Sequence, residues 1–249
     1  MVTLTTKHRT DGFGAQFQNI LFDILYTKIQ TNNTYIFPDI KSFEHNYDKD
    51  PLFTQKLIDY TNLKHHFLNT HNVTNPTCYD TRLTYSFCEN NLSYILHSTA
   101  FKELQNMFFE NKQTPFDTKF FNVAVHIRRH NQEDIRVAGT DTPDHYYLNL
   151  IQHCRRNYRG PKPLKFHIYS QGPSSNFSMY VSNDTEFHLN EFVLDTFNGL
   201  VFADCLIISG TSFSYVAAIL NKGRIYYKRF WHKPATHWII GDHIPVQSK

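Results

Sequence analysis

The sequence has little excess charge of either sign, and it contains no internal repeat and no low-complexity segment. Its 25 Lys and Arg against 22 Asp and Glu leave a net charge of +3 with histidine neutral. That value is too small to indicate a nucleic-acid or anionic-membrane partner. With 19% charged and 16% aromatic residues in 249, the composition is that of a globular chain with a substantial core, in one large domain or two small ones.

Long apolar runs, a signal-peptide pattern and C-x-x-C pairs are also missing. We therefore expect a soluble, cytoplasmic protein without a transmembrane segment, and no cysteine-based zinc site. Cys154 and Cys205 fall inside apolar segments and are expected in the core. Cys78 and Cys88 have polar neighbours, and the sequence leaves open whether they pair.

The most informative segment is 121–130, where a short apolar strand ends in two adjacent arginines. Because strand side chains alternate, we expect one buried face and an opposite face that delivers His126 and Arg128 together at the carboxyl end. Ligands bind at that end of the strands in open α/β sheets. A guanidinium there can make two parallel bonds to a phosphate or carboxylate.

A second anion-suited feature is Ser209-Gly-Thr-Ser-Phe-Ser214, in which a buried strand is expected to turn directly into a helix. The free N–H groups and positive dipole end of such a helix favour anions, and Thr211, Ser212 and Ser214 add hydroxyl donors. Ordinary N-capping explains one feature of this kind. Two of them in the same half of the chain predict a shared crevice.

A third feature is the turn Asp11-Gly-Phe-Gly-Ala-Gln16, which precedes a helical stripe of Phe17, Ile20, Leu21, Ile24 and Leu25. As a nucleotide fingerprint it is incomplete, because the third glycine and a P-loop lysine are both missing. The glycines would let the backbone approach a ligand closely.

Strands alternate with helices, which predicts an α/β fold with mostly parallel sheets covered on both faces. We expect strands at 2–6, 35–37, 121–128, 165–170, 186–189, 204–209 and 223–228. We expect helices after residue 16, at 98–111, from N-cap Thr142 with Pro143 first up to Gly160, at 191–203, and between Gly210 and Gly223 with Phe213, Val216, Ala217 and Leu220 on one buried face. Two domains are expected, 1–115 and 116–249.

No metal site is expected. The only D-x-D, at Asp48 and Asp50, has loop-like flanks, and His65-His66 and His153 have no carboxylate or cysteine partner at ligand spacing. The late aromatic residues are expected in the core or closing segment, although Trp231 would suit a sugar face.

Taken in order, these motifs resemble the fucosyltransferase superfamily. His126-Ile-Arg-Arg129 is similar to the H-x-R-R motif of α1,2-, α1,6- and protein O-fucosyltransferases. The segment 11–16 resembles the early G-x-G-N-Q of the α1,2 enzymes, and Tyr146-Tyr147 has a counterpart there. The segment 209–220 is similar to their late S-S-F-S-x-W-A-A-x-L block, so the α1,2 enzymes resemble the chain best.

The resemblance implies a GT-B architecture of two Rossmann-like halves facing across a cleft, with an N-terminal acceptor-side domain and a C-terminal nucleotide-sugar-binding domain. It implies an inverting transfer of fucose from GDP-fucose to a glycan acceptor, without a metal or other cofactor. Arg128 would hold the β-phosphate and act as the main catalytic residue, while Asp11 and Glu133 are base candidates by position alone. The other implied donor-site residues are His126, Arg129, Asp195, Thr211, Ser212, Phe213 and Ser214, and those lining the cleft from the N-terminal half are Gly12, Phe13, Gly14 and Gln16.

The chain departs from the family pattern at two places near the donor. Tyr169-Ser-Gln-Gly172 stands where relatives often carry an acidic pair, and His130-Asn-Gln-Glu133 replaces the acidic residue after the arginines. A GDP-linked hexose or a pentose donor such as xylose therefore stays open. So does a non-catalytic carbohydrate binder, whereas the mild charge argues against RNA binding. The missing anchor fits a bacterial or viral source, and the sequence leaves the oligomeric state open.

Overall fold

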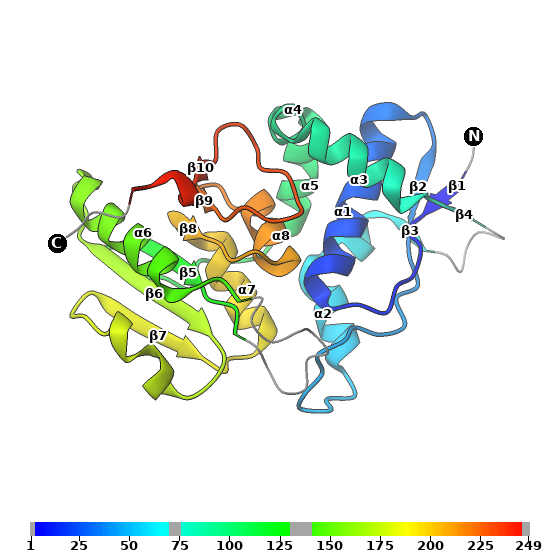
Figure 1. Cartoon of the computed structure of the whole chain (residues 1–249). Coiled ribbons are helices and arrows are strands. Elements are labelled where there is room, and N and C mark those ends of the chain that lie inside the picture. The colour runs from blue at the N-terminus through cyan, green and yellow to red at the C-terminus, as the bar shows by residue number, and fades with distance from the viewer. Residues whose placement is uncertain (1–2, 70–75, 130–140, 246–249) are drawn as a thin grey trace. The chain divides into compact units, whose positions relative to one another are not determined.

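The computed structural model describes residues 3–69, 76–129 and 141–245 (Figure 1). Contacts divide the chain into two compact units, the first comprising Met1–Gln113 and Lys233–Thr236 and the second Thr114–His232 and His237–Lys249. Each unit has its own sheet of parallel strands, which confirms the predicted α/β class.

The first unit contains a four-stranded parallel sheet in the order β3-β2-β1-β4. Its strands are β1 (Thr3–Thr5), β2 (Thr34–Phe37), β3 (Leu68–Asn69) and β4 (Thr77–Cys78). The first two were predicted from the sequence. The last two are two residues long, too short to leave a pattern of alternating side chains.

Five α-helices and a short 3-10 helix complete the described part of this unit. They are α1 (Phe13–Gln30), α2 (Phe53–Thr61), η1 (Leu63–His66), α3 (Thr81–Asn90), α4 (Leu92–His97) and α5 (Thr99–Phe109). The expected helices correspond to α1 and α5, and Ser98 caps α5 by accepting a bond from the Phe101 N–H at 3.1 Å. The sequence did not reveal α2, α3 and α4. In α3 only Thr84 and Cys88 are buried, so its apolar stripe is weak.

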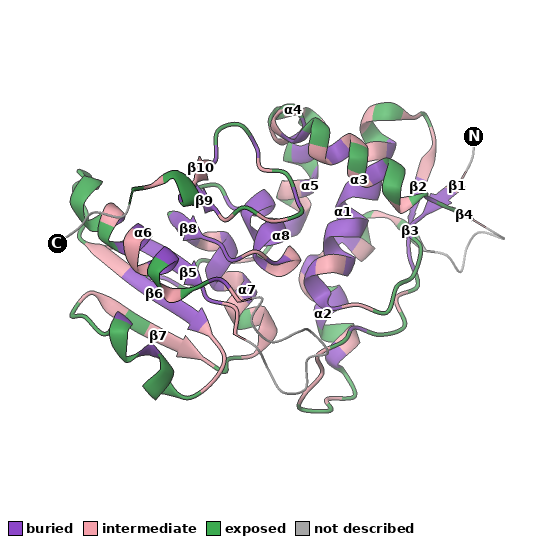
Figure 2. Cartoon of the chain, viewed as in Figure 1, coloured by how far each residue is buried: buried purple, intermediate pink, exposed green. Residues whose placement is uncertain are grey.

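Helix α1 is buried on nearly all sides, with thirteen of its eighteen residues inside (Figure 2). It contacts β2, α3 and α5, which leaves little of it facing water. The predicted stripe is buried, but so are polar side chains outside it. One of them, Asp23, is 1% exposed, and neither of its carboxylate oxygens has a hydrogen-bond partner among the described residues.

The second unit contains a six-stranded parallel sheet in the order β10-β9-β8-β5-β6-β7. The strands are β5 (Phe121–His126), β6 (Leu164–Ser170), β7 (Thr185–Leu189), β8 (Cys205–Ile207), β9 (Arg224–Tyr227) and β10 (Ile239–Ile240). All but β10 were predicted, so the expectation that the chain's last strand ends at residue 228 was wrong. The short β10 adds to the sheet edge beside β9.

Strand β5 lies in the middle of this sheet, between β6 and β8. The prediction that it buries only one face was wrong. Val123 and Val125 pack in the core with α6 (Asp144–Asn157), and on the opposite face Asn122, Ala124 and His126 are buried as well. A central parallel strand is covered by helices on both sides, so its polar side chains are drawn into the interior too.

The remaining helices of the second unit are α7 (Val193–Phe202), α8 (Ser212–Leu220) and the 3-10 helices η3 (Ser174–Tyr180) and η4 (Gly241–His243). Two details differ from expectation. Pro143, not Thr142, precedes α6 at the cap position. Helix α8 is buried along its whole length from Ser214 to Leu220 instead of on one face, with Phe213 only partly covered.

The four cysteines are free thiols, so Cys78 and Cys88 are not paired. Cys154 and Cys205 are buried, as predicted. Among the described helices, none has both the length and the apolar composition required to cross a membrane.

Asp23 gives the first testable prediction. Burial raises its pKa from 3.8 to about 6, against the opposing effect of the Thr6 and Thr84 hydroxyls. The folded state therefore holds a proton more tightly than the unfolded state, and stability falls as pH rises from about 3.8 through about 6. Two pH units correspond to roughly 3 kcal/mol. We expect Asp23→Asn to stabilise the protein by up to that amount at pH 7.5 and by much less at pH 4, measured by urea unfolding.

The matched control is Asp48→Asn, because Asp48 is exposed in the same unit. It should leave stability unchanged at both pH values. An equal effect of Asp23→Asn at pH 4 and pH 7.5 would contradict the assignment of a raised pKa.

Candidate functional site

The second unit brings the two predicted anion-suited features to one edge of its sheet. Strands β5 and β8 are parallel neighbours, with Val125 opposite Ile207, so both carboxyl ends lie at the same edge. Just beyond those ends, His126 Nδ1 and Ser209 Oγ are 2.8 Å apart and hydrogen-bonded. Both side chains are buried, at 8% and 0% exposed. The strand ends are thus joined directly through side chains.

Three hydroxyl groups form a cluster at the start of α8, which we call the hydroxyl cluster: Ser209, Thr211 and Ser214. Their oxygens lie 3.0 to 3.3 Å from one another. Thr211 caps α8 by accepting a bond from the Ser214 N–H, and Ser214 Oγ donates to the Ser209 carbonyl at 3.0 Å. These bonds fix the turn, so the first-turn N–H groups of α8 that have no acceptor within the helix are held in place.

Arg128 follows β5 at a position where the backbone is still tied to β6. The Ile127 N–H donates to the Tyr169 carbonyl at 2.9 Å, and Ser170 Oγ donates to the Ile127 carbonyl at 2.7 Å. The Arg128 side chain is half-buried, and its Nη1 donates to Gln171 Oε1 at 3.4 Å. Gln171 directly follows β6. A neutral amide therefore contacts this guanidinium.

Arg129 has different surroundings from its neighbour. Its guanidinium forms an ion pair with Asp144, the first residue of α6, and lies 5.6 Å from the centre of the Phe177 ring. The Tyr180 hydroxyl donates to the same Asp144 oxygen. These contacts connect Arg129 to α6 and η3. They give this arginine a structural function that does not require a bound ligand.

The residues around the first turn of α8 are fixed by aromatic contacts. The Phe213 ring lies 5.3 Å from both the His126 and the Phe197 rings. Ser212 Oγ is 3.2 Å from His232 Nε2, a contact that the sequence did not suggest. His232 in turn stacks on Tyr215 of α8 at 4.7 Å. This stacking explains why a histidine twenty residues away reaches the helix start.

His126 is neutral in the folded protein. Burial, and secondarily the charge of Arg128, lower its pKa from 6.5 to about 3. A neutral ring can accept the Ser209 hydroxyl at Nδ1 or donate to it, depending on its tautomer. Its function at the strand end is therefore hydrogen bonding rather than supply of positive charge.

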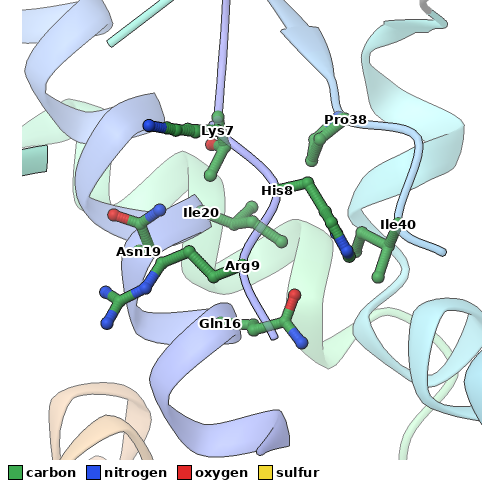
Figure 3. Close-up of a pocket in the computed structure, with 9 residues that line it drawn as sticks. Lys7, His8, Arg9, Gln16, Asn19, Ile20, Pro38 and Ile40 are labelled. Carbon is green, nitrogen blue, oxygen red and sulfur yellow. The ribbon is translucent and has the colours of Figure 1, made fainter. Parts of the chain in front are cut away.

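The first unit has a shallow hollow near the ends of β1 and β2, with about 250 Å³ of empty space when the open solvent at its mouth is included (Figure 3). Its walls come from the segment after β1, from α1 and from the loop after β2. Lys7, His8 and Arg9 make one wall basic, and Asn19 contributes a buried amide oxygen without a hydrogen-bond partner among the described residues. The lining residues are Thr6, Lys7, His8, Arg9, Gln16, Asn19, Ile20, Pro38 and Ile40.

Of the predicted N-terminal residues, Gln16 lines this hollow. Its Nε2 donates to the carbonyls of Asp11 and Ser42, at 2.7 and 3.0 Å, so the side chain is fixed. Gly12 precedes α1, and a Cβ there would come within 2.8 Å of the His45 ring. At Gly12, the group that approaches the backbone closely is therefore the side chain of His45. Phe13 and Gly14 are buried in the first turn of α1.

Asp11 is partly buried and accepts a bond from the Gly12 N–H at 2.8 Å, with Arg9 3.5 Å from its other oxygen. Glu133, the other predicted base, lies outside the described residues. Asp195 is exposed in the first turn of α7. Trp231 is exposed, whereas Tyr226 and Tyr227 are buried, as expected for core aromatics.

In the D-x-D segment, Asp50 contacts residues that lie close to it in sequence. Asp50 accepts a bond from the Leu52 N–H and pairs with Lys56 at 2.7 Å. Among the described residues, one group could hold a metal ion: His167, Glu186 and His188. The sequence analysis missed this group. Its signal is that Glu186 and His188 are two apart on one strand and so share a face, next to the strand that carries His167.

No model of a known protein family matches the sequence, and no curated protein matches it. Among solved structures, the chain is similar to the fucosyltransferase NodZ from Bradyrhizobium, with 13% identity, TM-score 0.44 and coverage of 90% of this chain and 94% of that one. It is similar to E. coli heptosyltransferase WaaC with ADP, at 8% identity, TM-score 0.46 and 96% and 92% coverage. A third is a variant of Arabidopsis thaliana FUT1 with GDP, at 10% identity, TM-score 0.42 and 95% and 72% coverage.

Structural neighbours thus include fucosyltransferases, as the sequence motifs predict, together with a heptosyltransferase. At such identities and TM-scores, the function has to be argued from the residues of this chain.

The lowered pKa of His126 gives a second prediction. Below about pH 6.5 the unfolded chain takes up a proton on this ring that the folded protein accepts only near pH 3. Stability should therefore fall by roughly 1.4 kcal/mol for each pH unit in that window because of this ring. We expect His126→Asn to be less stable than the wild type at pH 7.5 but to lose less stability on acidification to pH 5, measured by urea unfolding.

His145→Asn is the matched control, since His145 is exposed on α6 in the same unit. In this variant the free energy of unfolding should change with pH as it does in the wild type. Parallel stability curves for the wild type and His126→Asn would show that the ring titrates normally.

Proposed function

We propose that the protein is an inverting, metal-independent glycosyltransferase that takes its sugar from a nucleoside diphosphate sugar, with GDP-fucose as the first candidate donor and a glycan as acceptor. The observation that carries the proposal is the convergence of Arg128 and the hydroxyl cluster at one sheet edge. Their positions in the chain match the order of the H-x-R-R and late S-S-F-S blocks of the fucosyltransferase superfamily.

The diphosphate is assigned to this edge because two kinds of anion ligand meet there. The first turn of α8 offers backbone N–H groups and the positive end of the helix dipole. The guanidinium of Arg128, two residues beyond the end of β5, offers two parallel charge-assisted bonds. One phosphate of the diphosphate would bind the first-turn N–H groups of α8, and the other would bind the Arg128 guanidinium. In this arrangement Ser212 contributes its hydroxyl, and Thr211 and Ser214 hold the turn.

The base of the nucleotide is assigned less directly. The resemblance implies that His126 and Asp195 contact guanine. Asp195 is exposed, so its carboxylate can accept bonds from a guanine N–H edge. His126 is buried and bonded to Ser209, so we assign it to positioning the hydroxyl cluster, with Phe213 packed against it. Arg129 is held by its ion pair with Asp144 of α6.

The proposed step is a single displacement. An acceptor hydroxyl oxygen forms a bond to the anomeric carbon, and the bond from that carbon to the β-phosphate oxygen breaks. The electron pair leaves with GDP, and Arg128 stabilises the charge that develops there. The proton of the hydroxyl passes to a base, for which Asp11 and Glu133 are the candidates.

The hollow in the first unit is the candidate place for hydroxyl groups of the acceptor. Asn19 offers a buried amide oxygen and Gln16 a fixed amide, and both suit a polyhydroxylated ligand. The identity of the donor sugar is the part of the proposal most affected by the differences between this sequence and the fucosyltransferase pattern. Gln171, in place of an acidic residue, contacts Arg128, so a GDP-hexose or a pentose donor is the alternative.

Arg128→Ala tests the proposal. We expect sugar transfer to fall by about 10² to 10³-fold or more, because the developing charge on the leaving diphosphate loses its main partner. The unfolding temperature should stay close to the wild-type value, since the side chain is only half-buried. Transfer and donor hydrolysis are measured with radiolabelled GDP-fucose, with and without a chelator.

Arg159→Ala is the control, because Arg159 is exposed in the same unit and bonds only to the Tyr158 carbonyl among the contacts described. Unchanged donor hydrolysis in Arg128→Ala would refute the assigned function of this residue. A thermal-shift series with GDP, UDP and CMP separates the alternatives. A shift with GDP supports the transferase, and no shift with any nucleotide favours a non-catalytic carbohydrate binder.

A further inference from the structure

A cluster of two histidines and a glutamate lies on the edge of the second sheet. His167 is on β6 and Glu186 and His188 are on β7, next to each other in the parallel pairing. His167 Nδ1 and His188 Nε2 are 3.0 Å apart, and Glu186 Oε1 is 3.8 Å from His188 Nε2. No residue of the Arg128 and hydroxyl-cluster site belongs to this group.

The tautomer of His167 follows from its partner on β5. Asn122 Nδ2 donates to the carbonyls of Asp117 and Phe120, at 3.1 and 3.2 Å. The amide oxygen of Asn122 therefore faces His167 Nε2, at 3.0 Å. An amide oxygen only accepts, so Nε2 carries the proton of His167. His167 is 5% exposed. In this tautomer of the neutral ring, Nδ1 presents a lone pair.

The tautomer of His188 follows in the same way. Its Nδ1 lies 2.8 Å from Glu191 Oε1. A carboxylate oxygen accepts, so Nδ1 carries a proton, and Nε2 is the nitrogen left to bind a second proton or a metal ion. The two ring nitrogens face each other across 3.0 Å, with an oxygen of Glu186 close by. Such an arrangement needs a positive centre between the rings, which is either an additional proton or a metal ion.

The spacing suits a metal ion. Bonds of 2.0 to 2.1 Å in tetrahedral geometry place zinc ligand atoms about 3.4 Å apart. The two separations of 3.0 and 3.8 Å lie on either side of that value, and all three ligand atoms are within 4.8 Å of one another. Only small side-chain adjustments would centre an ion.

The surroundings of the cluster support the same assignment. Each histidine has its non-ligating N–H bonded to an oxygen, Asn122 for one and Glu191 for the other, which is the usual arrangement behind histidine metal ligands. The His188 ring stacks on Tyr169 at 4.5 Å, and Phe116 lies 4.5 Å from His167. Lys165 holds the other oxygen of Glu186 at 3.3 Å. The ring orientations are therefore fixed before any ion arrives.

We propose that His167, Glu186 and His188 form a binding site for a divalent transition ion of the zinc type. Glu186 is 51% exposed, so solvent reaches the site and supplies the fourth ligand. The ion links the edge strand β7 to β6 and stabilises this part of the sheet. The chemistry of sugar transfer does not pass through it, so chelation leaves the proposed transfer unaffected.

The experiment measures Zn²⁺ binding by competition with a chromophoric chelator, and Co²⁺ binding by its visible absorption. A Cys78→Ser background removes the exposed thiol that would compete. We expect saturable binding of one ion per chain, a tetrahedral Co²⁺ spectrum and a higher unfolding temperature with Zn²⁺. No donor or acceptor is needed, so the result is independent of the proposed function.

His188→Ala should weaken binding by at least 10²-fold, and Glu191→Gln, which acts through His188, by about 10-fold. Glu186→Gln replaces a half-exposed carboxylate, keeps the fold and should also weaken binding. His145→Ala, on an exposed histidine of the same unit, should bind like the wild type. The absence of saturable binding would overturn the proposal. Wild-type affinity in both His188→Ala and Glu186→Gln would overturn it as well.

Discussion

The hydrogen bond between His126 and Ser209 joins the ends of the two strands on which the proposed functional site of the second unit is built. It exists because β5 is central and parallel, so its polar face is covered and His126 is forced to find a partner inside. The partner belongs to the turn that starts α8. Through that turn the bond fixes Thr211 and Ser214, and with them the N–H groups of the first helical turn. Arg128 follows the same strand, two residues after its last residue.

The burial of this face of the sheet also explains why a row of polar side chains across it is hydrogen-bonded from strand to strand. Asn122 is on the same face of β5 as His126, and it bonds to His167 on β6, which faces His188 on β7. Each of these side chains is held by a neighbour because none can turn to water freely. The proposed anion site at the strand ends and the histidine cluster at the sheet edge are therefore two results of one constraint, the covering of a polar sheet face.

Much of the second unit could be predicted from sequence, because its strands are apolar runs bounded by turn residues. The strand at 121–126, the helix after residue 211 and the two arginines at the strand end all lie where the pattern places them. What the pattern did not show is burial on both faces of β5 and on all sides of α8. Periodicity identifies an apolar face, but a polar residue such as Asn122 or Ser214 gives no sign that a helix covers it.

The first unit was harder to predict, for a related reason. Helices α2, α3 and α4 are short, and the two-residue strands have no period. Contacts between strands are also invisible in a linear pattern. Glu186 and His188 suggest a shared face, but only the pairing of β7 with β6 brings His167 beside them. Likewise His232 reaches Ser212 only through its stacking on Tyr215.

The central claim is that a nucleoside diphosphate binds at the strand edge between Arg128 and the start of α8. A titration of isotope-labelled protein with GDP, followed by amide NMR, tests it most directly. We expect the largest shifts at the backbone amides of Ser212, Phe213 and Arg128. Shifts confined to the hollow lined by Arg9 and Asn19, or no shifts at millimolar GDP, would contradict it.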